Sequence, residues 1–316
     1  MTPIDDGRHD PPRATICLTF DNLGEAADVE MGRWPEGRPF GQHYTATKTV
    51  PRLIEELDGL PATFFVEGWN AEVYPDLLRT MAATGHEIAC HGWRHELWST
   101  LDDTTRRRCL RQAIDAFARI GVAVQGLRPP GGFLPDGVLA LVGEADLAYV
   151  SAAGDTPSIE SGVVSLPFRW IDLDGFYLDP AAAKTVGLEV PSGVEPTLHG
   201  FFSHLDDVIA DLTMRGGQAV VVMHPYIIET TEGYWAALQS FLGRLRANQD
   251  IALSTCGRSV RRVRRQDKDR RLSPARKWTA GFFPTIAFQL TYRPLTSPPS
   301  SPSSSCRRRR SGGCRG

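Results

Sequence analysis

The sequence predicts an α/β protein built on a parallel β-sheet, and two observations carry this prediction. Between Ala14 and Leu253, short β-rich runs alternate with helix-length amphipathic runs. Several of the β-rich runs are apolar throughout, as are strands that a parallel sheet buries on both faces. The alternation places the helices outside a sheet that is either open or closed into a barrel. In both architectures chemistry is expected at the carboxyl ends of the strands.

The expected strands are short runs rich in apolar residues. They cover residues 14–20, 62–66, 86–90, 121–127, 147–152, 163–168, 218–224 and 251–255. The runs between them show i, i+3, i+4 apolar spacing, with acids near their starts and Gly just after several of their ends, which predicts helices. The expected helices cover residues 49–60, 74–85, 102–121, 135–145, 204–217 and 233–249.

The composition is that of an ordinary globular protein, with 41% hydrophobic and 23% charged residues in a chain of 316. No apolar stretch is long enough to span a bilayer, so no membrane partner is expected. The first residues contain acids and prolines where a secretory signal has a basic start and an apolar run, which predicts a cytoplasmic protein. The six cysteines form no CxxC pair, so we expect reduced thiols, mostly in the core.

Charge divides the chain at about Cys256. Residues 257–316 contain 16 Lys and Arg but only two acids, so the net charge of −2 conceals an acidic remainder. This basic, low-complexity end is expected to be a disordered tail, and nucleic-acid binding is disfavoured because no aromatic residues interleave with the basic cluster. We therefore expect a flexible N-terminus over residues 1–13, one domain over 14–256 and a tail over 257–316.

Polar residues stand at the ends of the first and third expected strands. Asp21 and Asn22 end the first; taken alone, this pair suits a turn or helix cap as well as a site. His91 and His95 follow the third, and two imidazoles four residues apart can face one metal ion. One such pair is weak support for a metal site when it stands alone.

Two further strand ends carry polar residues. Arg128 opens a Pro-Pro-Gly-Gly loop in which the glycines allow backbone N–H groups to approach a ligand. His224 ends the strand 218–224. A lone histidine there is more often a core residue than a catalyst, but all four sites fall on βα junctions. Their common position favours one functional site.

Five short motifs lie in order along residues 14–254: TFDN, ATFFVEG, GHEIACHGWRHE, LRPPGG and VVMHP. Together they resemble the NodB-type polysaccharide deacetylases, the fourth carbohydrate esterase family. The HGW form of the second motif is also seen in allantoinase-like members. The resemblance implies a distorted (β/α)-barrel and metal-dependent hydrolysis of N-acetyl groups from amino sugars.

The resemblance also implies roles for individual residues. Asp21 matches the catalytic base, Arg128 the arginine that pairs with it, and His224 the general acid. His91 and His95 match the two histidine ligands of a divalent metal, with Zn²⁺ expected. The backbone of Pro130, Gly131 and Gly132 is expected to face the substrate and complete the oxyanion site. Apart from the resemblance, the aromatic residues Trp69, Trp93, Trp98 and Tyr226 are candidates to line the cleft, with a core position as the alternative.

The acid that orients the general acid is not fixed by sequence. Near Trp170, both Asp172 and Asp174 fall on the same face of an extended segment, and Asp174 is weakly favoured. A long connection, residues 30–44, separates the first strand from the first helix. On the active face such a connection is a candidate lid or substrate wall.

One residue departs from the family pattern. Asn22 stands where most members have an acid that binds the metal, and a neutral amide oxygen predicts weaker binding. The expected function is a metal-dependent hydrolase of non-peptide C–N amide bonds, deacetylating an oligosaccharide or a related small N-acyl substrate. Two alternatives stay open: a cyclic amide or imide hydrolase of the allantoinase-like type, and a non-catalytic carbohydrate-binding descendant. The sequence leaves the oligomeric state open.

Overall fold

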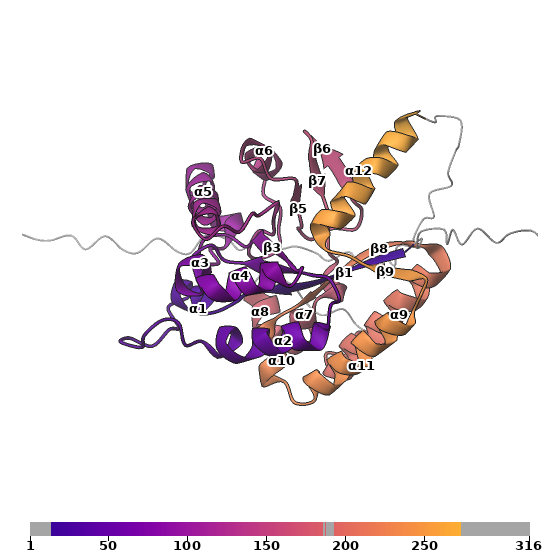
Figure 1. Cartoon of the computed structure of the whole chain (residues 1–316), viewed down its shortest axis with the longest axis horizontal. Helices are drawn as coiled ribbons and strands as arrows, with labels where there is room; N and C mark the ends of the chain where they lie inside the picture. The colour runs from indigo at the N-terminus through magenta and orange to yellow at the C-terminus, as the bar shows by residue number, and fades with distance from the viewer. Residues whose placement is uncertain (1–13, 186, 188–192, 273–316) are drawn as a thin grey trace, which may run out of the picture.

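The computed structural model describes residues 14–272 except 186 and 188–192 (Figure 1). At its centre is a curled sheet of nine described strands. The strands are β1 Ala14–Asp21, β2 Ala62–Val66, β3 Glu87–Cys90, β4 Gly126–Leu127, β5 Tyr149–Val150, β6 Ser158–Glu160, β7 Val163–Ser165, β8 Gly217–Met223 and β9 Ile251–Leu253. Each expected strand is present, although only the last two residues of 121–127 are extended.

The strand order is β6-β7-β5-β4-β3-β2-β1-β8, and β9 pairs with the first half of β1. Every pairing is parallel except the β6–β7 hairpin. Arg128, which follows β4, hydrogen-bonds Thr19 and Asp21 of β1, three strands away. A side chain can reach that far only because the sheet is strongly curled. The predicted distorted (β/α)-barrel is thereby confirmed as a half-barrel of parallel strands.

Helices cover the outside of the sheet. They are α1 Ala26–Glu30, α2 Val50–Leu57, α3 Asn70–Val73, α4 Pro75–Ala83, α5 Asp103–Arg119, α6 Val138–Glu144, α7 Asp174–Leu178, α8 Pro180–Thr185, α9 Leu198–Arg215, α10 Pro225–Thr230, α11 Tyr234–Ala247 and α12 Cys256–Leu272. Single turns η1 Thr45–Thr49, η2 Trp98–Thr100 and η3 Trp170–Asp172 complete the described elements. Within this described part, no helix is both long and apolar enough to cross a membrane.

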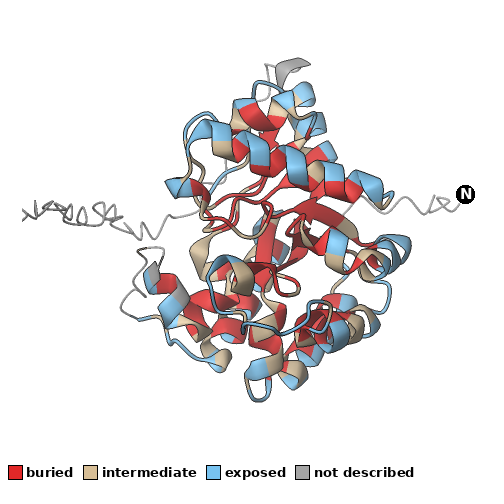
Figure 2. Cartoon of the chain, turned by 90° about the vertical axis from the view of Figure 1, so that its left-hand side faces the viewer, coloured by how far each residue is buried: buried red, intermediate tan, exposed pale blue. Residues whose placement is uncertain are grey.

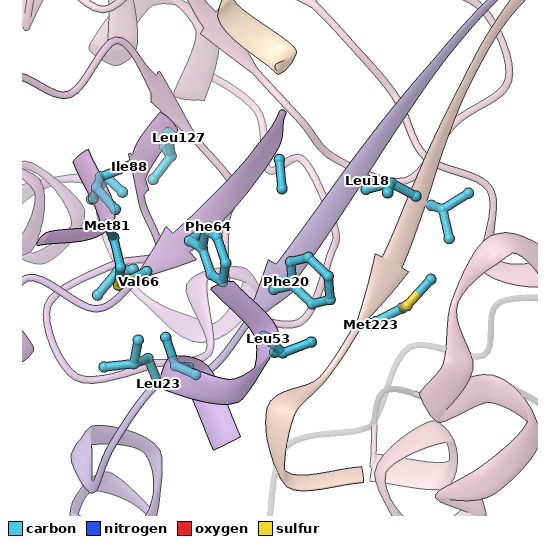
Figure 3. Close-up of a cluster of buried hydrophobic side chains, with 14 of the residues drawn as sticks. Leu18, Phe20, Leu23, Leu53, Phe64, Val66, Met81, Ile88, Leu127 and Met223 are labelled. Carbon is cyan, nitrogen blue, oxygen red and sulfur yellow. The ribbon is translucent and has the colours of Figure 1, made fainter. Parts of the chain in front are cut away.

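Strand alternation separates two hydrophobic clusters. On β1, Ile16, Leu18 and Phe20 point outward to the helices, while Cys17 points into the barrel. Figure 3 shows the outer cluster, where the rings of Phe20 and Phe64 stack 5.0 Å apart. Figure 2 shows that burial is concentrated on the strands and on the inner faces of the helices. The four described cysteines are free and buried, as expected.

The basic run after Cys256 contradicts one expectation. The prediction of a disordered tail is wrong for residues 257–272, because these residues form helix α12 together with Cys256. Cys256, Val260 and Val263 recur at helical spacing inside the basic run and pack on the inner cluster, and Figure 1 shows α12 lying beside β6 and β7. Arg264 also donates to the carbonyl of Gly162 at 2.8 Å. The rest of the expected tail, residues 273–316, and the expected flexible N-terminus, 1–13, lie outside the described residues.

Candidate active site

The inner row of side chains changes from apolar to polar at the carboxyl ends of the strands. Side chains two residues apart on a strand share a face. Cys17, Ala89 and Val222 point inward on β1, β3 and β8. The same alternation, continued along each strand, brings Asp21, His91 and His224 to the inner mouth of the barrel. This is the physical reason why these strands end on polar residues.

Asp21 and Arg128 form a buried ion pair. An Arg128 Nη1–H donates to Asp21 Oδ1 at 2.6 Å and to Thr19 Oγ1 at 2.9 Å, and Nη2 donates to Ser151 Oγ at 2.9 Å. The guanidinium also lies 3.9 Å from the centroid of the Phe65 ring. With both charged groups almost fully buried, each compensates the charge of the other, so removal of either would leave a costly isolated charge.

His224 and Asp174 form a second pair. Asp174 is fully buried at the start of α7 and accepts from His224 Nδ1 at 2.6 Å and from the His224 backbone N–H at 2.8 Å. The hydroxyl of Tyr234 also donates to this carboxylate, at 3.0 Å. Burial acts to lower the pKa of His224, but the charge and hydrogen bond of Asp174 outweigh it and raise this pKa. His224 Nε2 is left as the nitrogen that can deliver a proton.

The structure therefore distinguishes the two acids that the sequence left open. Asp174 bonds His224, whereas Asp172 accepts two hydrogen bonds from Arg169, both at 2.8 Å, and one from His204 Nε2 at 2.8 Å. Asp172 thus ties η3 to α9. Asp172 ends the turn η3 and Asp174 begins α7, so the two residues belong to different helical elements and the alternation expected for one extended segment does not apply.

His91 and His95 lie side by side as neutral imidazoles. Their ring centroids are 5.0 Å apart. Burial lowers the pKa of His91 to about 3 and the pKa of His95 to about 3, so both keep a lone pair at neutral pH. His91 Nδ1–H donates to the carbonyl of Arg128 at 2.8 Å, which leaves Nε2 as the coordinating atom. Nearby His224 further lowers both values, so the three histidines share one site.

The residues present fit a divalent metal with two nitrogen donors. Asn22 has a left-handed backbone, with φ of 64°, and its Oδ1 atom is buried without a hydrogen-bond partner in the described chain. A buried amide oxygen without a partner is costly, and coordination would satisfy it. In the described ranges, no three His, Cys, Asp or Glu side chains are arranged to hold a metal. His91, His95 and the amide of Asn22 are therefore the candidate donors.

The loop after Arg128 narrows the choice of a backbone donor. Gly131 and Gly132 have φ of 83° and 75°, and a Cβ on Gly132 would lie 2.6 Å from the Trp170 ring. Proline has no N–H, which removes Pro130 as a donor, and the Gly132 N–H donates to the carbonyl of Pro129 at 3.0 Å. The N–H of Gly131 is therefore the candidate for an oxyanion donor.

Two of the aromatic residues expected in the cleft, Trp93 and Tyr226, differ in placement. Trp93 is only 9% exposed and packs in the outer core, which fits a packing role. Tyr226 is half-buried, its ring centroid lies 5.5 Å from that of His224, and its hydroxyl donates to Asp179 at 2.9 Å. Tyr226 thus stays the candidate for substrate contact.

Glu67 is a buried carboxyl group near Asp21 that the sequence analysis missed. It is fully buried directly after β2, and one oxygen accepts from Leu23 N–H at 3.2 Å and Asn70 Nδ2 at 2.9 Å. Burial raises the pKa of Glu67 to about 8. Strand alternation could have found it, because Glu67 stands two residues beyond inward-facing Phe65.

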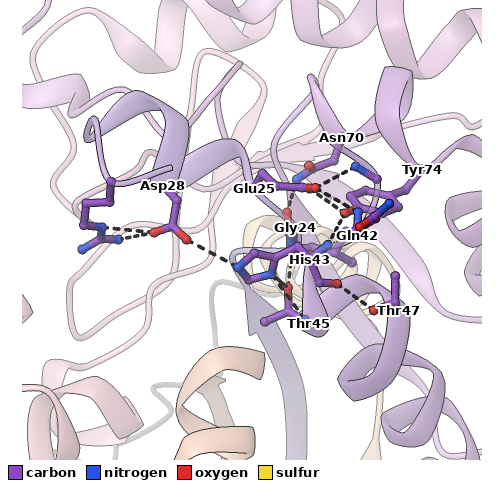
Figure 4. A network of polar contacts seen from close by, with 12 residues as sticks. Gly24, Glu25, Asp28, Gln42, His43, Thr45, Thr47, Asn70 and Tyr74 are labelled. Atoms are coloured by element: carbon purple, nitrogen blue, oxygen red, sulfur yellow. Dashed lines mark hydrogen bonds and ion pairs between the residues drawn. The ribbon is translucent and has the colours of Figure 1, made fainter. Parts of the chain in front are cut away.

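The long connection before α2 is held by a polar network (Figure 4). Buried Glu25 accepts from the N–H groups of Gly41 and Gln42 at 2.7 and 3.2 Å and from the Tyr74 hydroxyl at 2.6 Å. His43 Nδ1 lies 2.6 Å from Thr45 Oγ1. These contacts hold residues 41–45, at the end of the connection next to η1, in place. Of the two roles expected for the connection, they favour a fixed substrate wall over a mobile lid.

Comparisons with known proteins agree with this geometry. Residues 8–150 match the sequence profile of the family described as polysaccharide deacetylase. The chain is 24% identical over 230 residues to a peptidoglycan-N-acetylglucosamine deacetylase of Bacillus cereus, covering 70% of each protein. It is 40% identical over 108 residues to a chitooligosaccharide deacetylase of Sinorhizobium fredii, which is 32% of this chain and 49% of that relative.

Solved structures share the fold. A protein of Mycobacterium smegmatis, provisionally described as a polysaccharide deacetylase, superposes with a TM-score of 0.67 and 28% identity over 82% of this chain and 92% of that one. The Puue allantoinase superposes with a TM-score of 0.63 and 19% identity, over 82% and 95% of the two chains. The second likeness concerns the fold alone.

Proposed function

We propose that this chain, whose residues 8–150 match the polysaccharide deacetylase family, is a NodB-type, metal-dependent hydrolase that removes the N-acetyl group of an amino sugar. The observation that carries the proposal is the pairing at the barrel mouth. Asp21 with Arg128 and His224 with Asp174 form two separate hydrogen-bonded pairs, and His91 and His95 lie beside them. A base, an acid and two neutral nitrogen ligands are the groups that amide hydrolysis requires.

In this proposal His91, His95 and Asn22 hold a divalent ion, for which Zn²⁺ is the first candidate. When bound, such an ion polarises the acyl carbonyl and lowers the pKa of a water molecule. Asp21 accepts a proton from the attacking water while Arg128 keeps the carboxylate in place. The water oxygen bonds to the acetyl carbon, and the N–H of Gly131 donates to the carbonyl oxygen as negative charge develops there.

His224 completes the reaction as the general acid. The amide nitrogen is a poor leaving group until it is protonated, and His224 Nε2–H supplies that proton as the C–N bond breaks. The raised pKa of His224 supports this role, because the charge and hydrogen bond of Asp174 stabilise the protonated ring. The products are acetate and the free amine. The cytoplasmic location expected from the sequence stays a prediction.

Acetate release from N-acetylglucosamine oligomers, with Zn²⁺ supplied, tests the proposed reaction. We expect Asp21→Asn to lower kcat by at least about 10³-fold, since the base is lost, with bound metal unchanged within twofold. Turnover is measured by an acetate assay and metal by elemental analysis. Metal loss in Asp21→Asn would instead make Asp21 a ligand, and no acetate release by the wild type from any N-acetyl sugar would contradict the reaction.

A cyclic-imide hydrolase is the second candidate, and Asn22 is the observation that favours it. An amide in place of a carboxylate ligand weakens metal binding. A cyclic imide needs less help from a metal than an N-acetyl amide does, because a second carbonyl stabilises its leaving nitrogen. The paired histidines oppose a metal-free form of this enzyme. Ring opening of simple imides in the absence of acetate release would identify this activity, and the absence of both would support a carbohydrate-binding descendant.

A further inference from the structure

The connection between α1 and η1, residues 31–44, presents aromatic side chains at its surface. Phe40 is 51% exposed, although its ring is large and apolar. Its backbone neighbours, Gly41 and Gln42, are held by the buried carboxylate of Glu25 (Figure 4). The exposed ring is therefore carried by a fixed part of the backbone.

Two tryptophans extend this aromatic surface. Trp34 stacks on Phe40 with ring centroids 6.2 Å apart, and Phe40 meets Trp69 edge to face at 4.9 Å. Arg38 covers part of the Trp34 ring, with its guanidinium carbon 4.4 Å from the centroid, and accepts from Trp34 Nε1 through its carbonyl at 3.1 Å. Trp34 thus packs against the Phe40 ring, while Phe40 is exposed and Trp69 is half-buried.

The aromatic surface adjoins the segment that contains the two histidines. The N–H of Trp69 donates to the carbonyl of Trp93, between His91 and His95, at 2.9 Å. The ion pair of Arg94 with Glu30, at 3.3 Å, ties the same segment to the residue just before the aromatic connection. Trp69 is therefore placed beside the segment that carries both candidate histidine ligands.

We propose that Phe40 and Trp69 form a subsite that stacks against a sugar ring next to the ring whose N-acetyl group is hydrolysed. This subsite rests on the proposed function. A pyranose ring presents C–H groups on its faces and hydroxyls at its edges. An aromatic side chain offers a rigid apolar face, at low cost in conformational entropy, against which the C–H face of the sugar can stack. The polar groups of Arg38 and Gln42 on the same connection can hydrogen-bond the hydroxyls at the edge of the sugar.

The subsite predicts that the enzyme discriminates by chain length. A monosaccharide fills only the catalytic position, whereas an oligomer also reaches Phe40. Truncation of the ring in Phe40→Ala should raise KM for an N-acetylglucosamine tetramer by roughly 3- to 10-fold, the range expected when one aromatic contact is lost. Its kcat, and the kcat/KM for the monomer, should stay within twofold of the wild type.

Two variants control for indirect effects. Phe40→Tyr keeps the aromatic face and should retain the wild-type KM for the tetramer. Met214→Ala removes another exposed apolar side chain, which lies on α9 and is 75% exposed, and should leave KM unchanged for both substrates. Equal KM values for the tetramer in Phe40→Ala and the wild type would overturn the subsite, and so would a parallel loss with both substrates.

Calorimetric titration separates the subsite from the reaction. If the wild type releases no acetate, the tetramer is titrated into wild type and Phe40→Ala, each as purified. Binding that weakens in Phe40→Ala but not in Met214→Ala retains the subsite in a non-hydrolysing protein. No binding to the wild type, or equal binding to both proteins, overturns it.

Discussion

Asn22 is the residue on which the chemistry of the proposed metal centre depends. Its backbone is left-handed, a conformation that Asn and Asp adopt more readily than other non-glycine residues. Its buried Oδ1 has no hydrogen-bond partner among the described atoms. An aspartate could adopt this backbone conformation equally well, so the turn alone does not explain why position 22 is an asparagine.

Asn22→Asp should therefore tighten metal binding. The added carboxylate brings a negative charge to a site with two neutral imidazoles, and we expect the Kd for Zn²⁺ to fall by at least about tenfold. Competition with a chromogenic chelator measures it. Asn22→Ala is the matched control and should weaken binding. An unchanged Kd in both variants would show that position 22 is not a ligand.

The burial of Glu67 is not evident from its residue type. Its place after ATFFV is visible in the sequence, but its burial is not. The turn after β1 folds back over it, and Asn70 Nδ2 donates both to Glu67 and to the carbonyl of Leu23. Glu67 thus joins the β1 and β2 ends through contacts between residues more than 40 positions apart.

Among the elements, α5 lies unusually close to the end of β2. Gly68 makes this possible: its N–H donates to the carbonyl of Gly92 at 3.0 Å, and a Cβ on it would lie 2.4 Å from Ala113 Cα of α5. Because the obstacle is helix backbone, a side-chain rotation cannot relieve the clash. The β2–α3 junction and α5 must then move apart.

Gly68→Ala should lower the free energy of unfolding by about 1–3 kcal/mol, the usual cost of overpacking a core. Urea denaturation measures it. Gly243→Ala on α11 is the matched control, because no atom lies within 4 Å of the added Cβ. That change should be neutral or stabilise by up to about 1 kcal/mol. Similar stabilities for both variants would show that α5 adjusts without cost.

Helix α12 forms where the amino-acid composition predicted disorder. Its charge density is typical of a solvated tail, yet Cys256 and Val260 are buried against the inner cluster. The backbone N–H of Gly257 donates to Glu87 at 2.8 Å, which fixes the start of the helix to β3. A few apolar positions at helical spacing were sufficient, because the sheet supplied a surface for them.

For the whole molecule, buried titratable groups make stability depend on pH. The pKa of Glu67 is raised by burial from 4.5 to about 8. Between these values the unfolded chain has lost the proton and the folded chain retains it. The folded state thus binds more protons, and stability falls as pH rises through this window.

We expect the free energy of unfolding of the wild type to fall between pH 6 and pH 8.5, with Glu67 contributing roughly 2–3 kcal/mol of the decrease. Glu67→Gln removes this titration and keeps an oxygen that can accept from Leu23 and Asn70. Its stability should therefore change less over the same range. Urea denaturation at both pH values compares the two proteins, and parallel slopes would show that Glu67 ionises normally.

The sequence by itself determined the parallel α/β architecture and the polar residues at the strand ends. Both follow from local patterns: apolar periodicity sets the elements, and strand alternation sets which residues face inward. Asp21, His91, Arg128 and His224 were accessible in this way. The tertiary structure decided which groups meet. It assigned Asp174 to His224, buried Glu67, docked α12 and set Phe40 beside Trp69, because each depends on contacts between distant segments that no local pattern encodes.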